Sequence, residues 1–542
     1  MSFTEPPHSE RRLSGIDFII RRAADLYPAR LAIDDRLRGR RLSYGELYSR
    51  SIRLARALTR LGVGKGDPVA YAFFNEHASL EAVFACSMIG AVAVPINGRL
   101  QPTEVGPYLR KHSCAVMMTN AELAHLADPA VSSTIVLRDA QGQAPHHALD
   151  YEALLAAESE QPLPAVVRWE DPYMMAMTGG TTGSPKAAVW SHGGAMMDAL
   201  SVALHMGVRR GACSVCLAPT YHAAGLGWGV MPVLWQGGYL IMPPSATFSA
   251  AFLQDELRRS AVDYLLVVPA LIEPLHDVWD GEPLRAGNVC VTSAPTTPAQ
   301  RAKLALMFPD SELIAGYGMT ETFSMTVQSP AEFLEMSLAV GEPSAASRVR
   351  IVNDDGRPVP VGTVGHIVGR TQGMCFGYDL DEENTRSTFR RLTDDSENLE
   401  WVFTGDIGFL DEEGRLTIVD RAKDVIISGG ENVASVEVEA VVAVHPLVRE
   451  CAAFGLPDER WGERVTVAIV TRDPASDLRG IGCEVIAQCR KQLAGYKVPK
   501  EIVFLDALPR TPFGKVVKRR LQSAEFLQRF NAAQLRERER SG

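Results

Sequence analysis

The chain has 542 residues, longer than a single hydrophobic core usually grows, so two or more domains are expected. Its composition, 46% hydrophobic and 22% charged residues, is ordinary for a soluble globular protein, and its net charge of −10 argues against a nucleic-acid partner. Nine scattered cysteines, no apolar signal in residues 1–13 and no apolar run long enough to span a bilayer predict a cytoplasmic protein without a transmembrane segment.

The first 340 residues alternate between helical and strand-like patterns. Apolar residues recur at helical spacing over 16–27 and 44–61, and the next three segments read as strand, helix and strand: 68–73, 79–90 and 92–96. The same alternation continues with strand-like segments at 214–217, 239–242, 264–268 and 288–292. It predicts a large α/β body with a parallel sheet and helices on both of its faces.

The pattern changes after Ser344, where short strands separated by Gly, Asp and Pro turns predict a small β-rich subdomain. A further module follows Lys423. Its segments read helix (436–444), strands (448–456 and 465–470), helix (482–492) and strand (501–505), which predicts a smaller α+β domain.

A glycine-rich segment connects two strand-like segments, 171–177 and 187–191. Glycines let a backbone approach an anion, and hydroxyls and a cation bind phosphate oxygens. The segment offers Thr178, Gly179, Gly180, Thr181, Thr182, Gly183, Ser184 and Lys186. It is not a Walker A loop, because Pro185 precedes Lys186 and Ala187 follows it. We interpret it as a phosphate-binding loop of another kind.

Two further motifs follow strand-like segments, where α/β proteins commonly bind ligands. The first, 219–225, carries His222. The second, 314–322, is expected to come after its strand. It offers Tyr317 as a flat face for a purine, Thr320 as a hydroxyl for a phosphate and Glu321 as an oxygen ligand for Mg²⁺.

The later motifs are each expected at a turn or loop. Asp406 in 403–406 can accept ribose hydroxyls, and Arg421 in 419–424 can bind ribose or phosphate as a fixed fork. The segment 428–433 is predicted to be a glycine loop, and 509–516 presents Lys515 between proline and glycine.

In this order, the motifs resemble those of the adenylate-forming superfamily, and in particular its AMP-dependent acyl-CoA synthetase/ligase family. Three residues depart from the pattern that is usual in the family. This chain has Gly179 where the family usually has Ser, Ala187 where it usually has Gly, and Ser293 where it usually has Gly, in the loop Ser293-Ala294-Pro295. The resemblance implies an N-terminal domain over 1–420, a hinge over 421–424 around Lys423, and a mobile C-terminal domain over 425–542 that carries the catalytic lysine.

The resemblance also implies a role for each site residue. Lys515, Glu321, Thr320 and His222 would be catalytic, with Glu321 as the metal ligand. The ATP or AMP site would comprise Thr178, Gly179, Gly180, Thr181, Thr182, Gly183, Lys186, Ser293, Ala294, Pro295, Tyr317, Gly318, Thr320, Asp406, Arg421 and Lys515. Coenzyme A would meet Ser428, Gly429, Gly430 and Glu431, and the acyl pocket would be lined by His222, Ala223, Ala224, Trp228, Gly316, Met319 and Phe323.

The implied activity is ATP-dependent ligation of a small carboxylic acid to coenzyme A through an acyl-adenylate, with Mg²⁺ as cofactor. Because Gly316 is small, we expect room beside it for a medium or long fatty acid or for an aromatic or alicyclic acid. Two alternatives stay open: a stand-alone adenylating enzyme that loads a carrier protein, and an inactive nucleotide-binding sensor. The sequence does not specify the acid or the assembly, for which a homodimer is one option.

Overall fold

The computed structural model describes residues 15–138, 148–164, 166–178, 185–335, 339–393, 395–473, 477–510 and 516–523. The chain divides into two compact units, and each is described by itself. The larger unit contains Met1–Thr296, Gln300–Val349 and Val368–Val402, and the smaller unit contains Thr297–Ala299, Arg350–Ile367 and Phe403–Gly542.

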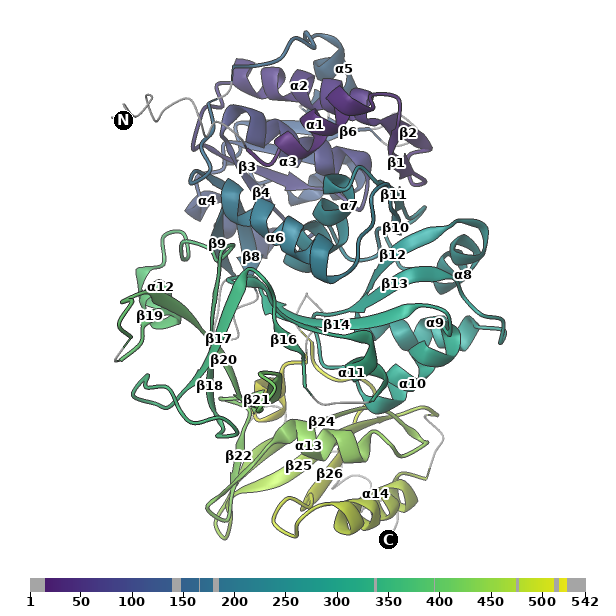
Figure 1. Ribbon diagram of the computed structural model, residues 1–542, viewed down its shortest axis with the longest axis vertical. Coiled ribbons are helices and arrows are strands. Elements are labelled where there is room, and N and C mark those ends of the chain that lie inside the picture. Colours follow the sequence, from purple (N-terminus) through teal and green to yellow (C-terminus); the bar gives the residue numbers. More distant parts are fainter. Residues whose placement is uncertain are drawn as a thin grey trace, which may run out of the picture. The chain divides into compact units, whose positions relative to one another are not determined.

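The larger unit contains a seven-stranded sheet (Figure 1). Its strands are, in spatial order, β7 (Leu149–Asp150), β6 (Ser133–Leu137), β5 (Val116–Asn120), β3 (Pro68–Ala72), β4 (Val92–Pro95), β8 (Pro172–Thr178) and β9 (Lys186–Ser191). All neighbours are parallel except β8 and β9, which form an antiparallel pair. The predicted βαβ alternation is therefore confirmed here.

A second sheet has nine strands, so the body contains two sheets where the alternation predicted one. Its strands are, in spatial order, β16 (Glu342–Pro343), β15 (Phe323–Gln328), β14 (Glu312–Met319), β13 (Ala286–Val291), β12 (Val262–Val267), β10 (Cys213–Val215), β11 (Tyr239–Met242), β1 (Leu31–Asp35) and β2 (Arg40–Ser43). The run from β14 to β1 is parallel, and the strands at both edges are antiparallel.

The helices of the body have the following bounds: α1 (Phe18–Leu26), α2 (Tyr44–Arg60), α3 (His77–Ile89), α4 (Pro102–Lys111), η1 (Ala121–Leu126), α5 (Tyr151–Ala156), α6 (His192–His205), η2 (Ala224–Val230), α7 (Met231–Trp235), α8 (Ala250–Arg259), η3 (Pro269–Leu271), α9 (Ile272–Val278), α10 (Pro298–Met307), α11 (Pro330–Leu334) and α12 (Glu382–Thr388). Helix α2 begins at a capping box. The Ser43 hydroxyl accepts the Glu46 N–H, and the Glu46 carboxylate accepts the Ser43 N–H.

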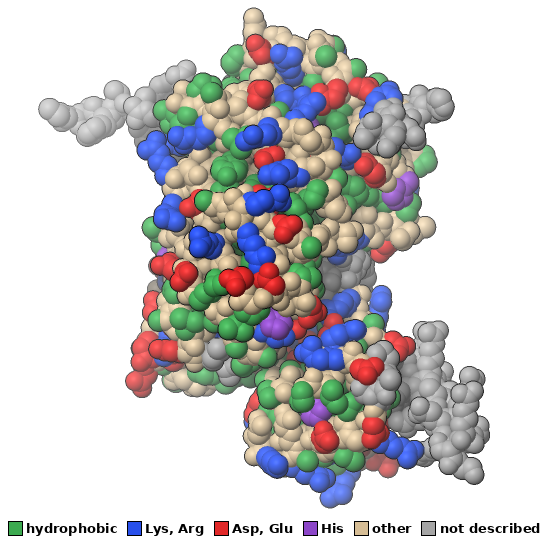
Figure 2. All heavy atoms as spheres, turned by 90° about the vertical axis from the view of Figure 1, so that its right-hand side faces the viewer, with side chains coloured by type: hydrophobic (Ala, Val, Ile, Leu, Met, Phe, Trp, Pro, Cys, Tyr) green, Lys and Arg blue, Asp and Glu red, His purple; other side chains and the backbone are tan. Residues whose placement is uncertain are grey.

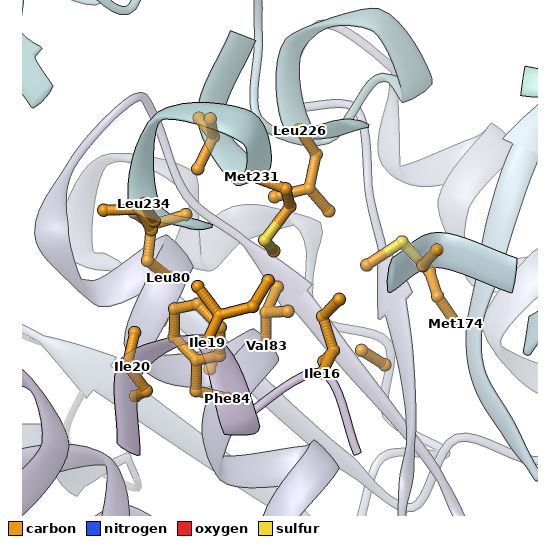
Figure 3. Packing of buried hydrophobic residues seen from close by; sticks show 14 of the residues in the cluster. Ile16, Ile19, Ile20, Leu80, Val83, Phe84, Met174, Leu226, Met231 and Leu234 are labelled. Carbon is orange, nitrogen blue, oxygen red and sulfur yellow. The ribbon is translucent and has the colours of Figure 1, made fainter. Parts of the chain in front are cut away.

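The main core of the larger unit lies between α1, α3 and the segment η2–α7. Helix α3 is buried along its whole length because it packs against α2 on one side and β3 and β4 on the other. Figure 3 shows the side chains that meet in this core: Ile16, Ile19 and Ile20 near α1; Leu80, Val83 and Phe84 from α3; Met174 from β8; and Leu226, Met231 and Leu234 from η2 and α7. This packing holds η2 in place.

A five-stranded sheet confirms the predicted β-rich subdomain. Its strands are β17 (Ser347–Val352), β18 (Gly365–Thr371), β20 (Glu400–Leu410) and β19 (Phe389–Arg391), with β21 (Leu416–Arg421) paired to β20. Strands β17, β18 and β20 each continue from one unit into the other.

The smaller unit contains the predicted α+β module. Its sheet has the order β23 (Glu431–Val433), β22 (Ile426–Ser428), β25 (Gly462–Thr471) and β24 (Val448–Asp458), with β26 (Glu501–Phe504) parallel to β25. Its helices are α13 (Ser435–Val442), α14 (Leu478–Gln492) and α15 (Lys518–Leu521). Valines and isoleucines from this sheet, α13 and α14 form a core of their own.

The face drawn in Figure 2 carries acidic and basic side chains interspersed with one another. Within the described ranges, no helix combines the length and the apolar character needed to cross a membrane. The mixed α/β architecture with a large and a smaller domain agrees with the fold class predicted from the sequence.

Candidate active site

The two strands that flank the glycine-rich segment form a hairpin. Thr178 ends β8 and Lys186 begins β9, and these two residues are paired across the hairpin. The residues between them, 179–184, lie outside the described residues, so their predicted phosphate contacts stay predictions. The structure confirms that the segment joins two adjacent strands.

Lys186 is held by two groups from a later part of the chain. Its Nζ donates a hydrogen bond of 2.5 Å to Asn384 Oδ1 in α12, and it lies 4.9 Å from the centre of the Tyr378 ring. The ring face attracts the ammonium, and the amide oxygen accepts one of its protons. The cation of the predicted phosphate loop is therefore fixed in position.

Tyr378 also contacts the predicted metal ligand. Its hydroxyl donates a 2.5 Å hydrogen bond to Glu321 Oε1, and the Glu321 side chain is buried. Burial, followed by the negative charge of Glu321, raises the pKa of Tyr378 well above its ordinary value, so the phenol keeps its proton. One tyrosine thus connects the lysine of one motif with the glutamate of another.

The segment around Glu321 begins within a strand. The sequence predicted that 314–322 would follow its strand, but β14 extends to Met319 and includes Tyr317 and Gly318, so that prediction is wrong. At Gly318, an added Cβ would lie 1.9 Å from the Phe323 carbonyl oxygen, which explains why glycine is needed where β14 approaches β15. The turn that follows contains Thr320 and Glu321, and Trp190 Nε1 donates a 2.9 Å hydrogen bond to the Thr320 carbonyl.

The predicted acyl-pocket residues lie around η2, a π-helix. Such helices are rare and often mark functional sites. His222 and Ala223 precede it, and the Ala224 N–H donates to His222 Nδ1 at 3.2 Å. Trp228, within η2, lies against Gly316: an added Cβ at Gly316 would be 2.6 Å from the Trp228 ring. Trp228 therefore packs against Gly316 on that side, while the expectation of room there for an acyl chain or a ring stays a prediction.

Ser293, which stands where the resembled family usually has glycine, has a φ of +76°. This is the left-handed region, where a side chain is strained. The usual glycine at this position is explained by that backbone conformation. Ala294 and Pro295 follow it and are exposed.

In the smaller unit, Asp406 and Arg421 lie opposite each other on β20 and β21. Arg421 Nε is 3.2 Å from Asp406 Oδ1, so the two predicted ribose-binding residues form an ion pair. The sequence placed each of them where a strand ends at a turn. This is confirmed for Arg421, which ends β21, but it is wrong for Asp406, which lies in the interior of β20. Burial and the Arg421 charge lower the pKa of Lys423, the predicted hinge residue.

The segment 428–433 is a tight hairpin, although the sequence predicted a loop. Ser428 ends β22 and Glu431 begins β23, and between them Gly429 and Gly430 have φ values of +66° and +84°. Two successive residues with positive φ form the type of two-residue turn that favours glycine. The catalytic lysine of the sequence prediction, Lys515, lies outside the described residues.

Sequence reasoning missed Tyr378 and Asn384. Tyr378 is 57 residues from Glu321, and Asn384 is 198 residues from Lys186. Neither belongs to a motif with its own chemical signature, and only the pairing of this segment with β9 brings them together.

Comparison with known proteins gives two family matches. The model of the AMP-binding enzyme family matches residues 20–379, and that of the AMP-binding enzyme C-terminal domain matches residues 437–515. Among curated proteins, the chain is 34% identical to a feruloyl-CoA synthase of an Amycolatopsis species, covering 89% of this chain and 93% of the relative. It is 32% identical to an indoleacetate–CoA ligase of Aromatoleum aromaticum, covering 92% and 96%.

Two solved structures also resemble the chain at 25% identity. The o-succinylbenzoate-CoA synthetase of Bacillus subtilis, in complex with its acyl-adenylate intermediate, has a TM-score of 0.79 and covers 93% of this chain and 98% of its own. ATP-bound MatB from Rhodopseudomonas palustris has a TM-score of 0.83 and covers 95% and 99%. Both cover nearly the whole of each chain.

Proposed function

Because the chain belongs to the AMP-binding enzyme family, we propose that it is an ATP-dependent ligase that joins a carboxylic acid to coenzyme A. The contacts that link Lys186, Tyr378 and Glu321 carry this proposal, since they bring together two motifs expected to meet the phosphates of ATP. Named acid–CoA ligases that match the chain along nearly their whole length support it.

In the first step, the acid attacks the α-phosphate of ATP and expels pyrophosphate, which gives an acyl-adenylate. The protein's contribution is positioning and charge stabilisation. Lys186, held by Asn384 and Tyr378, would supply a positive charge next to the phosphate loop, and the Trp190 bond to the Thr320 carbonyl holds the backbone that carries the Thr320 hydroxyl. We assign to Lys515 the role of stabilising the negative charge that builds on the α-phosphate during this attack.

The residues present fit a Mg²⁺ ion. Glu321 is a buried carboxylate with one oxygen bonded to Tyr378, which orients it, and hard oxygen ligands are those that Mg²⁺ prefers. Bound there, Mg²⁺ would supply neutralising charge for the pyrophosphate that leaves. The residues that hold the nucleotide sugar are assigned as Asp406 and Arg421.

In the second step, the coenzyme A thiol attacks the acyl carbonyl carbon, forms the thioester and releases AMP. We assign the Gly429-Gly430 turn to the thiol's approach, because neither residue carries a side chain and the space beside Gly430 is open. We also assign 421–424 as a hinge between domains spanning 1–420 and 425–542, so that one site serves both steps. Lys423→Pro is then expected to slow thioester formation and spare adenylate formation.

We propose an aromatic carboxylic acid as the substrate. Trp228 fills the space beside Gly316, which disfavours a long fatty acid and leaves a flat apolar wall. The acids named for the similar ligases, such as ferulate and indoleacetate, are aromatic. Both observations favour a compact ring over an extended chain.

The test is release of AMP from Mg-ATP with coenzyme A across a panel of aromatic, alicyclic and fatty acids. AMP and thioester formed together from aromatic acids support the proposal. Pyrophosphate exchange without thioester would assign the acceptor to a carrier protein, and ATP binding without exchange for any acid would assign the protein as a nucleotide sensor.

A further inference from the structure

Among the buried polar atoms of the larger unit that have no hydrogen-bond partner within the described residues, three oxygens lie in two elements that contact each other. They are Asp198 Oδ2 and Ser201 Oγ in α6, and Ser324 Oγ in β15. These side chains are 4%, 5% and 3% exposed, respectively. Buried polar atoms in folded proteins nearly always have a partner, so three without one in neighbouring elements require an explanation.

The three residues form a single group. Asp198 Oδ1 accepts the Ser324 N–H at 3.1 Å, which places the carboxyl directly over the start of β15. Asp198 and Ser201 are three residues apart in α6 and so share one face of that helix. The group therefore combines a carboxyl and two hydroxyls at the contact between α6 and β15.

This group lies beside the predicted acyl pocket. A Cβ added to Gly227 would lie 3.4 Å from Asp198 Oδ2 and 3.7 Å from the Phe323 ring, an ordinary contact, so a methyl-sized atom fits there. Gly227 stands in η2 between Leu226, which Figure 3 shows in the core, and Trp228, which covers Gly316. The polar oxygens thus border the same part of η2 that supplies the pocket wall.

The surroundings indicate the kind of group that fits. Burial raises the pKa of the Asp198 carboxyl to about 8, and only the Ser324 N–H opposes this. At neutral pH the carboxyl is mainly protonated, so it offers one donor and one acceptor and carries no charge. An uncharged polar group matches it better than an amine, which would need a negative partner.

We propose that Asp198, Ser201 and Ser324 form a subsite for an uncharged hydrogen-bonding group, a hydroxyl or ring N–H, on the far end of an aromatic acid. The proposal rests on the proposed function and narrows its substrate class. A substrate group of this kind would satisfy oxygens that the protein leaves without partners, while an acid lacking it would leave them buried and unsatisfied.

The test compares 4-hydroxycinnamate with cinnamate in coenzyme A-dependent AMP release. We expect the wild-type protein to favour the hydroxylated acid in kcat/KM, and Asp198→Ala to lower the ratio of the two kcat/KM values about 10- to 100-fold. Asp198→Asn keeps a donor and an acceptor and should keep the ratio within about fivefold. Ser324→Ala, which keeps the N–H bond to Asp198, should lower the ratio about 5-fold.

Tyr108→Phe is the matched control. It also removes one buried oxygen without a partner among the described residues, but from α4, and should leave the ratio unchanged. Equal losses for both acids in Asp198→Ala would show that Asp198 only supports the fold, and would overturn the proposal. A wild-type protein that does not distinguish the two acids would also overturn it.

A binding measurement separates failure of the subsite from failure of the proposed function. Phenol and toluene are titrated against the wild-type and Asp198→Ala proteins by ligand-observed NMR, without ATP. A preference for phenol that Asp198→Ala abolishes supports the subsite even if no acid is converted, in which case the proposed function fails alone. Equal binding of phenol and toluene to the wild-type protein overturns the subsite.

Discussion

Two groups of polar residues in the larger unit differ in how their hydrogen bonds are satisfied. Around Glu321, the carboxylate, the Tyr378 hydroxyl and the Lys186 ammonium all have partners within the protein. Around Asp198, a carboxyl oxygen and the Ser324 hydroxyl have none among the described residues. The Glu321 and Asp198 side chains are both buried, so exposure to water does not explain the difference between the two carboxyl groups.

This difference indicates whether each group is already held by the protein before its ligand binds. Groups that are fully held before a ligand arrives need no rearrangement, which suits the nucleotide, the same in every reaction cycle. Groups left without partners lower the stability of the free protein, because burying an unsatisfied polar atom costs about 1–3 kcal/mol. Such groups gain their partners only from the acid, and they therefore suit selection among acids.

The comparison predicts its largest effect at Asp198, on how the free energy of unfolding changes with pH. Its folded-state pKa of about 8 lies above the ordinary value of 3.8, so on unfolding between these values the carboxyl releases a proton. Stability from this group is complete below pH 3.8 and is lost as the pH rises towards 8. Asp198→Asn stays neutral, so we expect it to gain about 1.4 kcal/mol relative to wild type for each pH unit in that interval.

Urea unfolding of both proteins near pH 5 and near pH 9 measures this gain. The difference should level off above about pH 8, where both the folded and unfolded wild-type chains carry the charge. A difference that is the same at both ends of the range would contradict the comparison, since it would mean that Asp198 is ionised in the folded protein.

At the other group, Glu321→Gln should reduce acid-dependent ATP–pyrophosphate exchange on the order of 100- to 1000-fold, because it removes the charge that orients the metal and the leaving pyrophosphate. Glu273→Gln is the matched control: its carboxylate forms an ion pair with Lys303 in α10 and should change the rate less than about twofold. Similar losses in both variants would argue against a special role for Glu321.

Tyr378→Phe tests whether the partners of Glu321 matter for chemistry. The ring remains for Lys186, but the hydroxyl that orients Glu321 is lost. We expect about a 10-fold loss of exchange activity, and a higher Mg²⁺ concentration should restore part of it, because second-shell groups tune metal affinity by such factors. If the loss does not depend on Mg²⁺ concentration, Tyr378→Phe acts by disturbing Lys186 or the fold, and not by changing metal affinity.

The sequence predicted the element order well, because helical and alternating periods are local properties of the chain. It predicted Lys186 and Glu321 as site residues because each lies in a motif, but it did not predict Tyr378, which only the pairing of its segment with β9 brings to them. Trp228 was expected in the pocket, yet its packing against Gly316 depends on how η2 is held, which no local pattern encodes. Lys515 lies outside the described residues and stays a prediction.

The smallest expected effect is on protein stability, and it concerns Ser293, which belongs to neither of the two polar groups. Ser293 has a φ of +76°, where a non-glycine residue is strained by about 1 kcal/mol. Ser293→Gly should relieve the strain in the folded protein. Glycine also gives the unfolded chain more conformational freedom, which offsets part of that effect, so we expect a net stabilisation of about 0.5 kcal/mol. Ser293→Ala keeps the strain and should not stabilise. If the two variants unfold at the same temperature, backbone strain at Ser293 is too small to affect the stability of this unit.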